Sequence, residues 1–312
     1  MATDTTTEAP PEISVDNETP RRRRRRRGSW RATSGLLATP TIWLIVFFVA
    51  PVVMVGLYSV GALTLLRLDD YLSLEHWRFF LFTSDVYLGL FWKSVRMSLG
   101  VSITSVLFAY PVAYLLALIA GTRKYTLLLV IIVPFLTSYL LRVLAWRVIL
   151  NPQGVFQSFL RSIDVLGPEQ QLDWMYNSTF AIYLVLSYVW VPFVALPIFV
   201  SLESLDHHML EASSDLGASR LRTFWTVTLP LSLPGVAAGF IFVFIPTIGE
   251  YVTPQIVGGP REGFMFGSAI NSAFTTGLDW QFGSAMAMFL IFAVAVLLAV
   301  FGRFLNVRSV AE

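Results

Sequence analysis

The sequence predicts an all-α membrane protein with six transmembrane helices. Hydrophobic residues make up 55% of its 312 residues and charged residues only 13%, and the mean hydropathy is +0.67, which excludes a soluble globular domain. A helix needs roughly 20 mainly apolar residues to cross about 30 Å of hydrocarbon. Six runs meet this requirement: 36–62, 94–119, 126–150, 179–201, 230–251 and 281–302. Because peptide groups in lipid must find their hydrogen bonds within the protein, we expect each run to be helical.

The region before the first run has a different composition. Residues 1–20 are rich in Thr, Glu, Pro and Asp and have no apolar period, which is typical of disorder. Arg21 to Arg27 are consecutive arginines, which we interpret as a topology anchor held by anionic lipid headgroups rather than a nucleic-acid site. We therefore assign 1–34 to a disordered cytoplasmic tail and 35–308 to one transmembrane domain. The first apolar run is too long for a cleaved signal peptide, so it is expected to remain as a helix.

Prolines occur inside several of the apolar runs. They predict kinks rather than breaks, because neighbouring helices can satisfy the carbonyl groups that a proline leaves free. The prolines concerned are Pro51, Pro111, Pro134, Pro192, Pro197, Pro234 and Pro246.

Basic residues predict the orientation of the spans, because cytoplasmic loops are enriched in Lys and Arg. With the N-terminus in the cytoplasm, the inside segments hold fourteen basic residues: Arg21 to Arg27, Arg31, Arg123, Lys124, Arg220, Arg222, Arg303 and Arg308. The outside segments then hold five, namely Arg67, Arg78, Lys93, Arg161 and Arg261. Both termini are therefore expected in the cytoplasm.

A polar segment of about 26 residues, 203–228, separates the fourth and fifth runs. It reads as two short packed helices. One apolar stripe follows helical spacing, with Asp206 as a suitable N-cap and Gly217 as a suitable C-terminal stop: Leu205, Met209, Ala212 and Leu216. A second stripe consists of Leu221, Phe224, Trp225 and Thr228, and Glu211 and Asp215 lie opposite Arg220 and Arg222. A loop with its own apolar stripe and separated charges is built to dock onto a partner.

This segment resembles the EAA loop of bacterial ABC importer permeases. That motif reads Glu-Ala-Ala, three residues, Gly, nine residues, Ile, one residue and Leu-Pro. Glu211, Ala212, Gly217, Leu229 and Pro230 match it at the same spacing. Ser213 and Val227 are mild departures, since they replace Ala and Ile. The resemblance implies that Glu211, Ala212, Asp215, Gly217, Leu229 and Pro230 couple the chain to an ATPase.

Other stretches look like the spermidine/putrescine permease family, over about residues 40 to 305. They are Leu136 to Trp146, Pro192 to Pro197, Leu202-Glu203, Leu231 to Gly235, Pro246 to Tyr251 and Gly258-Gly259. This resemblance implies the type I ABC importer permease fold and a location in the inner membrane of a bacterium. It also implies four kinds of partner: a second, non-identical permease, two ATPase subunits, an extracytoplasmic substrate-binding protein and membrane lipid, with no nucleic acid. The substrate it favours is a polyamine, while ferric iron, opines and phosphonates remain alternatives.

Ionisable residues within the spans are candidates for the substrate pathway, because a charge at the bilayer centre costs roughly 2.5–3.5 kcal/mol on insertion scales. Arg142 and Glu250 lie at similar depth in the outer halves of the third and fifth runs, which permits an ion pair. Glu250 with the aromatic residues Tyr139, Trp146 and Tyr251 would suit a cationic amine, whereas Arg142 would not. A structural ion pair and a pathway role both remain open. Arg96 and Arg147 lie near outer span ends, where they can reach the interface.

Enzymatic chemistry finds no support in the sequence. The chain has no Cys, its three His (His76, His207 and His208) lie in loops, and no metal site is expected. It has no phosphate-cradling Gly-Lys-Ser/Thr loop, so ATP and magnesium are expected on the partner ATPases and this chain binds no cofactor. An ion-coupled secondary transporter is the alternative of a different class, and it is disfavoured by six spans without a repeat. An intramembrane hydrolase would need a Ser–His or paired-Asp site, which these runs lack.

Overall fold

The structure is a computed structural model that describes residues 40–64, 67–68, 72–167 and 169–309. The predicted disorder and anchor of residues 1–34 lie outside these residues. The chain divides into two units, Met1–Val52 and Val53–Glu312, and each is described by itself.

The described part of the first unit begins the first span, Pro40–Ser59. This span contains a π-helical turn, η1 (Ile45–Val49), and the helix α2 (Ala50–Ser59). Every residue from Pro40 to Pro51 is exposed, including the large apolar side chains. Such a helix has the uniform apolar surface that lipid requires.

Four helical segments of the second unit are also long and apolar enough to cross a membrane: Asp85–Ile119, Thr179–Glu203, Arg220–Ile248 and Trp280–Arg303. They contain α4 (Asp85–Tyr114) with the π-helical turn η3 (Leu115–Ile119), α8 (Thr179–Glu203), α10 (Arg220–Thr223) with η7 (Phe224–Thr228) and α11 (Leu229–Ile248), and α15 (Trp280–Ser309). They confirm four further predicted spans. The prolines inside α4, α8 and α11 do not end these helices, as expected.

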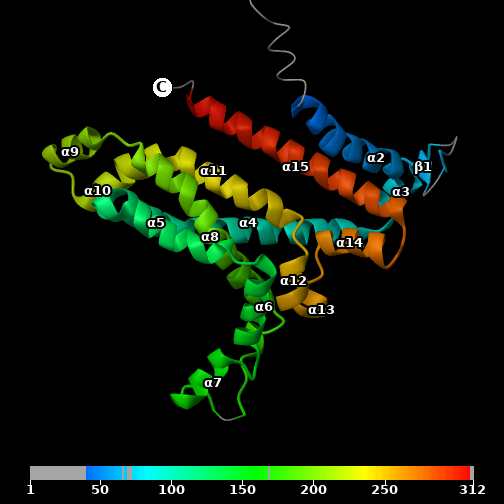
Figure 1. Ribbon diagram of the computed structural model, residues 1–312, viewed down its shortest axis with the longest axis horizontal. Coiled ribbons are helices and arrows are strands. Elements are labelled where there is room, and N and C mark those ends of the chain that lie inside the picture. The colour runs from blue at the N-terminus through cyan, green and yellow to red at the C-terminus, as the bar shows by residue number, and fades with distance from the viewer. Residues whose placement is uncertain (1–39, 65–66, 69–71, 168, 310–312) are drawn as a thin grey trace, which may run out of the picture. The chain divides into compact units, whose positions relative to one another are not determined.

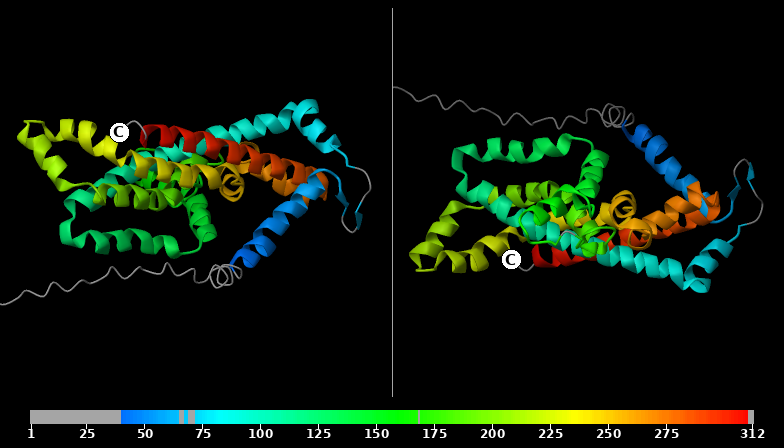
Figure 2. Two further views of the ribbon diagram at one scale, coloured as in Figure 1. Left: turned by 90° about the horizontal axis from the view of Figure 1, so that it is seen from above. Right: turned by 90° about the horizontal axis from the view of Figure 1, so that it is seen from below.

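The third span differs from its prediction, because residues 126–150 do not form one kinked helix. After the turn η4 (Gly121–Arg123), α5 (Lys124–Ile132) passes into the 3-10 turn η5 (Val133–Leu136), and α6 (Tyr139–Leu150) begins after two extended residues. The two helical segments meet at 84° (Figures 1 and 2). Pro134 lacks an N–H and disfavours helical geometry before it, so it starts a break here. The described residues therefore contain five candidate spans, or six if the bent pair is one span.

The core of the second unit lies where α4, α8 and α11 pack against one another (Figure 1). Small residues allow the helices to approach closely, as is common between membrane helices. A Cβ atom added at Gly235 of α11 would lie 2.4 Å from Ser201 Cβ and 2.6 Å from the Pro197 carbonyl oxygen of α8. Hydroxyl pairs also join the helices, since Thr104 and Ser187 are 2.6 Å apart and Tyr110 and Ser232 are 2.9 Å apart.

Shorter elements gather at the two ends of these helices (Figure 1). At one end, α9 (His207–Asp215) and α10 connect α8 to α11. At the other end lie α12 (Val252–Val257), α13 (Gly259–Glu262) and α14 (Phe266–Thr275). The remaining elements are the antiparallel pair β1 (Leu63–Thr64) and β2 (Arg67–Leu68), α3 (Glu75–Arg78), η2 (Phe79–Thr83), α7 (Val155–Ser162) and η6 (Asp173–Met175).

The close approach of α8 and α11 can be tested with a pair of glycines. Gly235→Ala places a methyl group against Ser201 and Pro197, so we expect it to destabilise the protein by about 1–3 kcal/mol through overpacking. Gly89→Ala in α4 is the matched control, because an added Cβ there meets nothing within 4 Å. Thermal unfolding of the detergent-purified chain measures both. Equal midpoints for the two variants would contradict the close packing of α8 and α11.

Candidate functional site

The first candidate site is the loop between α8 and α11, residues 203–228, which we call the coupling loop. The Asp206 side chain accepts a hydrogen bond from the His208 N–H at 2.9 Å, which confirms the expected N-cap of α9. Gly217 ends the helix with φ +78°, a conformation that favours glycine. The Gly217 N–H donates to Ser214 O and the Ala218 N–H donates to Ser213 O, at 2.9 and 3.1 Å. This is the Schellman pattern of helix termination.

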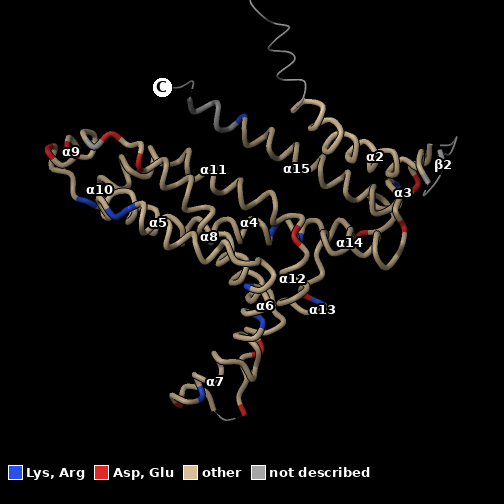
Figure 3. The backbone as a smooth tube through the Cα atoms, in the orientation of Figure 1, with Lys and Arg blue, Asp and Glu red and all other residues tan. Residues whose placement is uncertain are grey.

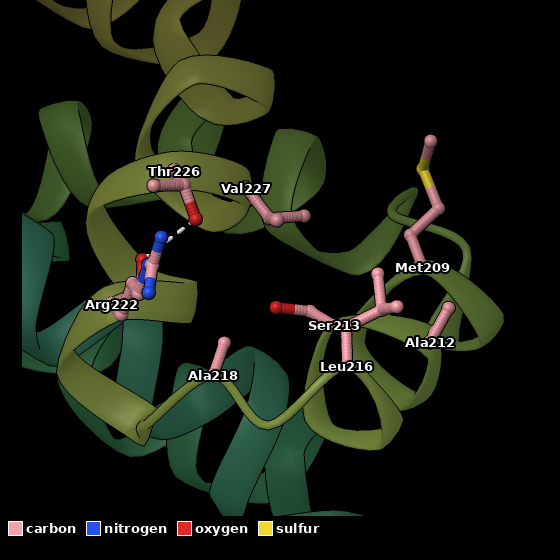
Figure 4. Close-up of a pocket in the computed structure, with 8 residues that line it drawn as sticks. All are labelled: Met209, Ala212, Ser213, Leu216, Ala218, Arg222, Thr226 and Val227. Carbon is pink, nitrogen blue, oxygen red and sulfur yellow. Dashed lines mark hydrogen bonds between the residues drawn. The ribbon is translucent and has the colours of Figure 1, made fainter.

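The two helices of the coupling loop enclose an open groove (Figure 4). Ser213 of α9 and Thr223 of α10 are linked by a hydroxyl pair of 2.9 Å. The groove has a volume of about 540 Å³ and is lined by Met209, Ala212, Ser213, Leu216, Ala218, Arg222, Thr226 and Val227. Ser213 points into the space between α9 and the segment that carries Arg222 and Val227 (Figure 4).

The apolar residues of the coupling loop fall into two sets. Leu205 and Phe224 pack against the core of the unit, and Thr228 is buried. Leu216, Leu221 and Trp225 are 89%, 70% and 60% exposed. Exposed apolar side chains of this size, gathered on one loop, are typical of a surface that another protein covers. The predicted stripes therefore divide into residues that hold the loop in place and residues that remain open for a partner.

Charges of opposite sign occupy different helices of this loop, with acidic residues on α9 and basic residues on α10 (Figure 3). The Glu211 carboxylate lies 3.4 Å from His208 Nδ1, and both side chains are largely exposed. Ala212 and Asp215 are exposed on the same helix. Leu229 and Pro230 form the first turn of α11, directly after the π-helical turn η7. The six residues predicted for coupling thus lie on α9, at its end, and at the start of α11.

The second candidate site is where α6 meets the start of α12, at the opposite end of the unit. The Glu250 carboxylate accepts a hydrogen bond of 3.0 Å from the Thr253 N–H, and the Tyr139 hydroxyl is hydrogen-bonded to the Thr253 hydroxyl. Thr253 is therefore hydrogen-bonded to both Tyr139 and Glu250. Glu250 stabilises the first turn of α12, since a free N–H at a helix start needs an acceptor.

Arg142 and Glu250 do not form the ion pair that their depth permits. Both residues lie near Tyr139, but no nitrogen of Arg142 is within 4.0 Å of the Glu250 carboxylate. The Arg142 guanidinium instead lies over the Phe135 ring, 4.9 Å from its centroid. Its Nε and Nη1 atoms are buried and meet no acceptor among the described residues. The cation is thus left with unused hydrogen-bond donors.

The two remaining predicted residues are placed differently. Trp146 packs edge-on against Tyr188 of α8, with ring centroids 5.3 Å apart. Tyr251 precedes α12 and is 37% exposed. The aromatic part of the predicted amine site is therefore divided between the α8 side of α6 and the start of α12.

Three side chains that the sequence analysis did not select hold α12 and α13 in place. Arg147 Nη1 donates to the Ile256 carbonyl, so this arginine does more than reach the interface as predicted. Lys93 Nζ donates to the carbonyl oxygens of Arg261, Glu262 and Phe264 at 3.3, 2.9 and 3.4 Å. The Thr179 hydroxyl donates to Glu262 at 2.9 Å. The only sequence signal for Lys93 and Arg147 was a charged residue beside the end of a span. Charged residues that merely face water give the same signal.

Comparison with known proteins assigns the chain to a family. Residues 86–309 match the family described as "Binding-protein-dependent transport system inner membrane component". The chain belongs to this family. It is 31% identical to the spermidine/putrescine transport system permease protein PotB of Haemophilus influenzae, over 70% of this chain and 76% of that protein. Identity to PotB of Escherichia coli K12 is 30%, over 86% of this chain and 96% of that protein.

A solved structure supports the fold independently. The crystal structure of a bacterial ABC transporter involved in the import of the acidic polysaccharide alginate has a chain that matches with a TM-score of 0.69. The match covers 88% of this chain and 94% of that chain, at 16% identity. The protein therefore has the all-α fold of an ABC importer permease, and as a member of this transport family it is a multi-pass membrane component rather than an enzyme.

Arg142 and Arg147 both lie on α6, which allows a matched test of the second site. Arg147→Met removes the donor to Ile256 and leaves that carbonyl without its partner, so we expect a loss of about 1–3 kcal/mol in stability. Arg142→Met removes donors that have no acceptor, so its loss is expected to be smaller. Thermal unfolding of the purified chain compares the two. An equal or larger loss for Arg142→Met would show that its guanidinium has a hydrogen-bond acceptor in this chain, in addition to its contact with the Phe135 ring.

Proposed function

We propose that this permease forms, with a second permease subunit, the pathway of an ATP-driven importer for a polyamine such as spermidine or putrescine. The observation that carries the substrate is the match to PotB of Escherichia coli, which extends over 86% of this chain and nearly all of that protein. The coupling loop supports the energy source, since its exposed groove and apolar residues need a partner. The chain itself supplies neither ATP hydrolysis nor a cofactor.

The complete importer has four further subunits in this proposal. Two ATPases bind ATP and magnesium and receive the coupling loops, a non-identical permease completes the pathway, and an extracytoplasmic binding protein delivers substrate. Acidic α9 and basic α10 would give the ATPase a surface with opposite charges on its two sides (Figure 3). No nucleic acid takes part, and lipid surrounds the spans.

The orientation follows from the distribution of charge. The coupling loop, both termini and the Lys124–Glu203 ion pair face the cytoplasm, while α12, α13 and α14 face the outside. This arrangement retains the excess of basic residues on the cytoplasmic side. It also places the substrate-binding protein at the end of the unit that holds Glu250 and Arg142.

Transport would proceed by alternating access. ATP binding favours the closed arrangement of the ATPases because ATP binds that arrangement more tightly. Because α9 and α10 are joined to α8 and α11, movement of the ATPases is passed to these spans as a rigid-body rotation. The close packing of α8 against α11 around Gly235 suits such a rotation, since two helices without space between them move together.

An anionic substrate, such as a phosphonate, is the second candidate. The unused donors of Arg142 favour it, because a half-buried guanidinium whose Nε and Nη1 atoms meet no acceptor among the described residues is suited to an anion. Ferric iron and opines remain the other substrates in the same importer class. An ion-coupled secondary transporter is disfavoured because the family depends on a binding protein.

Uptake by the reconstituted importer tests the substrate. Proteoliposomes that contain both permeases, the ATPases and internal ATP are expected to accumulate labelled spermidine or putrescine when the binding protein is added. Unlabelled polyamine should compete, and a phosphonate or ferric ion should not. Uptake of the phosphonate without uptake of either polyamine would replace the first candidate by the second.

A pair of glycines tests the role of the coupling loop. Gly217→Val and Gly121→Val each force a branched side chain into positive φ, at φ +78° and +54°, with nothing within 4 Å of the added Cβ. Each change is expected to cost about 1–3 kcal/mol of local strain. Gly217→Val and, as a separate variant, Glu211→Arg should each abolish the stimulation of ATP hydrolysis by the substrate-loaded binding protein. Gly121→Val should leave this stimulation intact. Equal stimulation in Gly217→Val and Gly121→Val would remove the coupling assignment.

A further inference from the structure

A second hollow lies at the opposite end of the unit from the coupling loop, and we call it the outer groove. Its volume is about 600 Å³, within the range of sites for small molecules. It is formed by η2 and the start of α4, by α14 with Phe264 before it, and by the turn of residues 276–279 that leads into α15. None of the residues predicted for coupling or for the pathway lines it.

Aromatic rings form one wall of the outer groove. Phe282 meets Tyr87 edge-to-face with centroids 5.0 Å apart, and it meets Phe79 edge-to-face at 5.8 Å. Phe79 is 44% exposed, so part of this wall is open. Aromatic faces attract cations, by about 0.5–1 kcal/mol at an exposed site and more where water is excluded.

The polar part of the outer groove carries negative charge. The exposed Asp279 lines it, and one of its carboxylate oxygens accepts the Phe282 N–H at 2.9 Å, while the other oxygen has no hydrogen bond from the residues that the structure describes. The C-terminal end of α14 also faces this region, where a helix contributes about half a negative charge. The N-terminus of α15 offsets a similar amount, so the net charge remains that of the carboxylate. No Lys or Arg is among the residues that line the groove.

The turn that carries Asp279 is strained. Leu278 has φ +50°, a left-handed conformation that is unusual for a residue other than glycine, asparagine or aspartate. The Asp279 N–H donates to Ala273 O at 3.0 Å, which fixes the turn against α14. Strain of this kind persists where the surrounding structure imposes it, and it is frequent at ligand sites.

We propose that the outer groove binds the primary ammonium group of a short oligoamine on the extracytoplasmic side of the membrane. The ammonium would donate to the other carboxylate oxygen of Asp279 and lie against the Phe79, Tyr87 and Phe282 rings. This rests on the proposed substrate class and names a site for it outside the Glu250 region. The two regions are joined by α14, since a Cβ at Gly267 near its start would meet Gly249 O, whereas its far end reaches the groove.

Binding of labelled spermidine to the full importer complex tests this site. The complex is placed in nanodiscs of phosphatidylcholine without the binding protein, and affinity is measured by equilibrium dialysis. Asp279→Asn keeps the acceptor for Phe282 and removes the charge, so we expect affinity to fall about tenfold, as for the loss of one charge-assisted hydrogen bond. Asp85→Asn is the matched control, because Asp85 is an exposed carboxylate at the start of α4 that does not line the groove.

A second pair of variants tests the aromatic wall. Tyr87→Leu is expected to weaken spermidine binding about threefold, through loss of a cation–π contact. Phe82→Leu is its control, since Phe82 is 82% exposed and lies outside the groove. Thermal unfolding identifies any variant complex that has lost its fold. If Asp279→Asn has lost its fold, the comparison of Tyr87→Leu with Phe82→Leu decides whether the groove binds the amine.

Several outcomes would overturn the proposal. Wild-type affinity in both Asp279→Asn and Tyr87→Leu would exclude the groove as an amine site, while continued uptake of spermidine would leave the proposed function intact. The ammonium of phosphatidylethanolamine has the same chemistry. If that lipid co-purifies with the wild type and is lost in Asp279→Asn, with spermidine affinity unchanged, the groove holds a lipid headgroup instead. Absence of spermidine uptake by the wild type would count against the proposed function itself.

Discussion

The need to satisfy every backbone N–H and C=O group inside the hydrocarbon determines most of this structure. Long helices meet this need by themselves, and α4, α8, α11 and α15 are uninterrupted over most of their length. Interrupted helices are tolerated only where other groups replace the missing hydrogen bonds. The segment that follows α11 shows these replacements, because Glu250 accepts the Thr253 N–H, Arg147 donates to Ile256 O and Lys93 donates to three carbonyls near α13. Charged residues at this end therefore stabilise backbone that would otherwise be unpaired.

The same constraint separates a rigid centre from two specialised ends. Between α8 and α11, Gly235 and Gly239 bring the backbones so close that a single added Cβ would lie 2.4–3.0 Å from its neighbours. Such packing leaves no room for independent sliding, so a displacement of α9 would move both spans. The coupling loop, by contrast, exposes Leu216, Leu221 and Trp225. Its stability within this chain comes from Leu205, Phe224 and its helix caps, so the exposed residues are free to meet a partner.

The sequence predicts some of these features better than others, for physical reasons. Apolar runs locate the spans well because hydropathy depends only on local composition. Asp206 and Gly217 are also predictable, since a cap and a positive φ follow from the residue types themselves. The break at Pro134 is not predictable from the sequence, because a proline permits either a kink or a break. Here contacts from Tyr139 to Thr253 and from Arg147 to Ile256 hold α6 in the bent direction. Those contacts join residues more than one hundred positions apart, which no local pattern reports.

The roles of Arg142, Arg147 and Glu250 show why charge alone is a weak guide to a transport pathway. From the sequence, all three are ionisable groups in the outer halves of spans. In the structure, Arg147 and Glu250 are hydrogen-bonded to the backbone of α12. Of the three, only Arg142 has buried nitrogens without an acceptor among the described residues. A carboxylate that already accepts a hydrogen bond from an N–H retains its charge, but it has fewer acceptor lone pairs left for a substrate. Selectivity for a cation by Glu250 alone would thus be opposed by the nearby Arg142. The groove around Asp279 has no Lys or Arg among its lining residues, so it would distinguish a cationic from an anionic substrate more effectively.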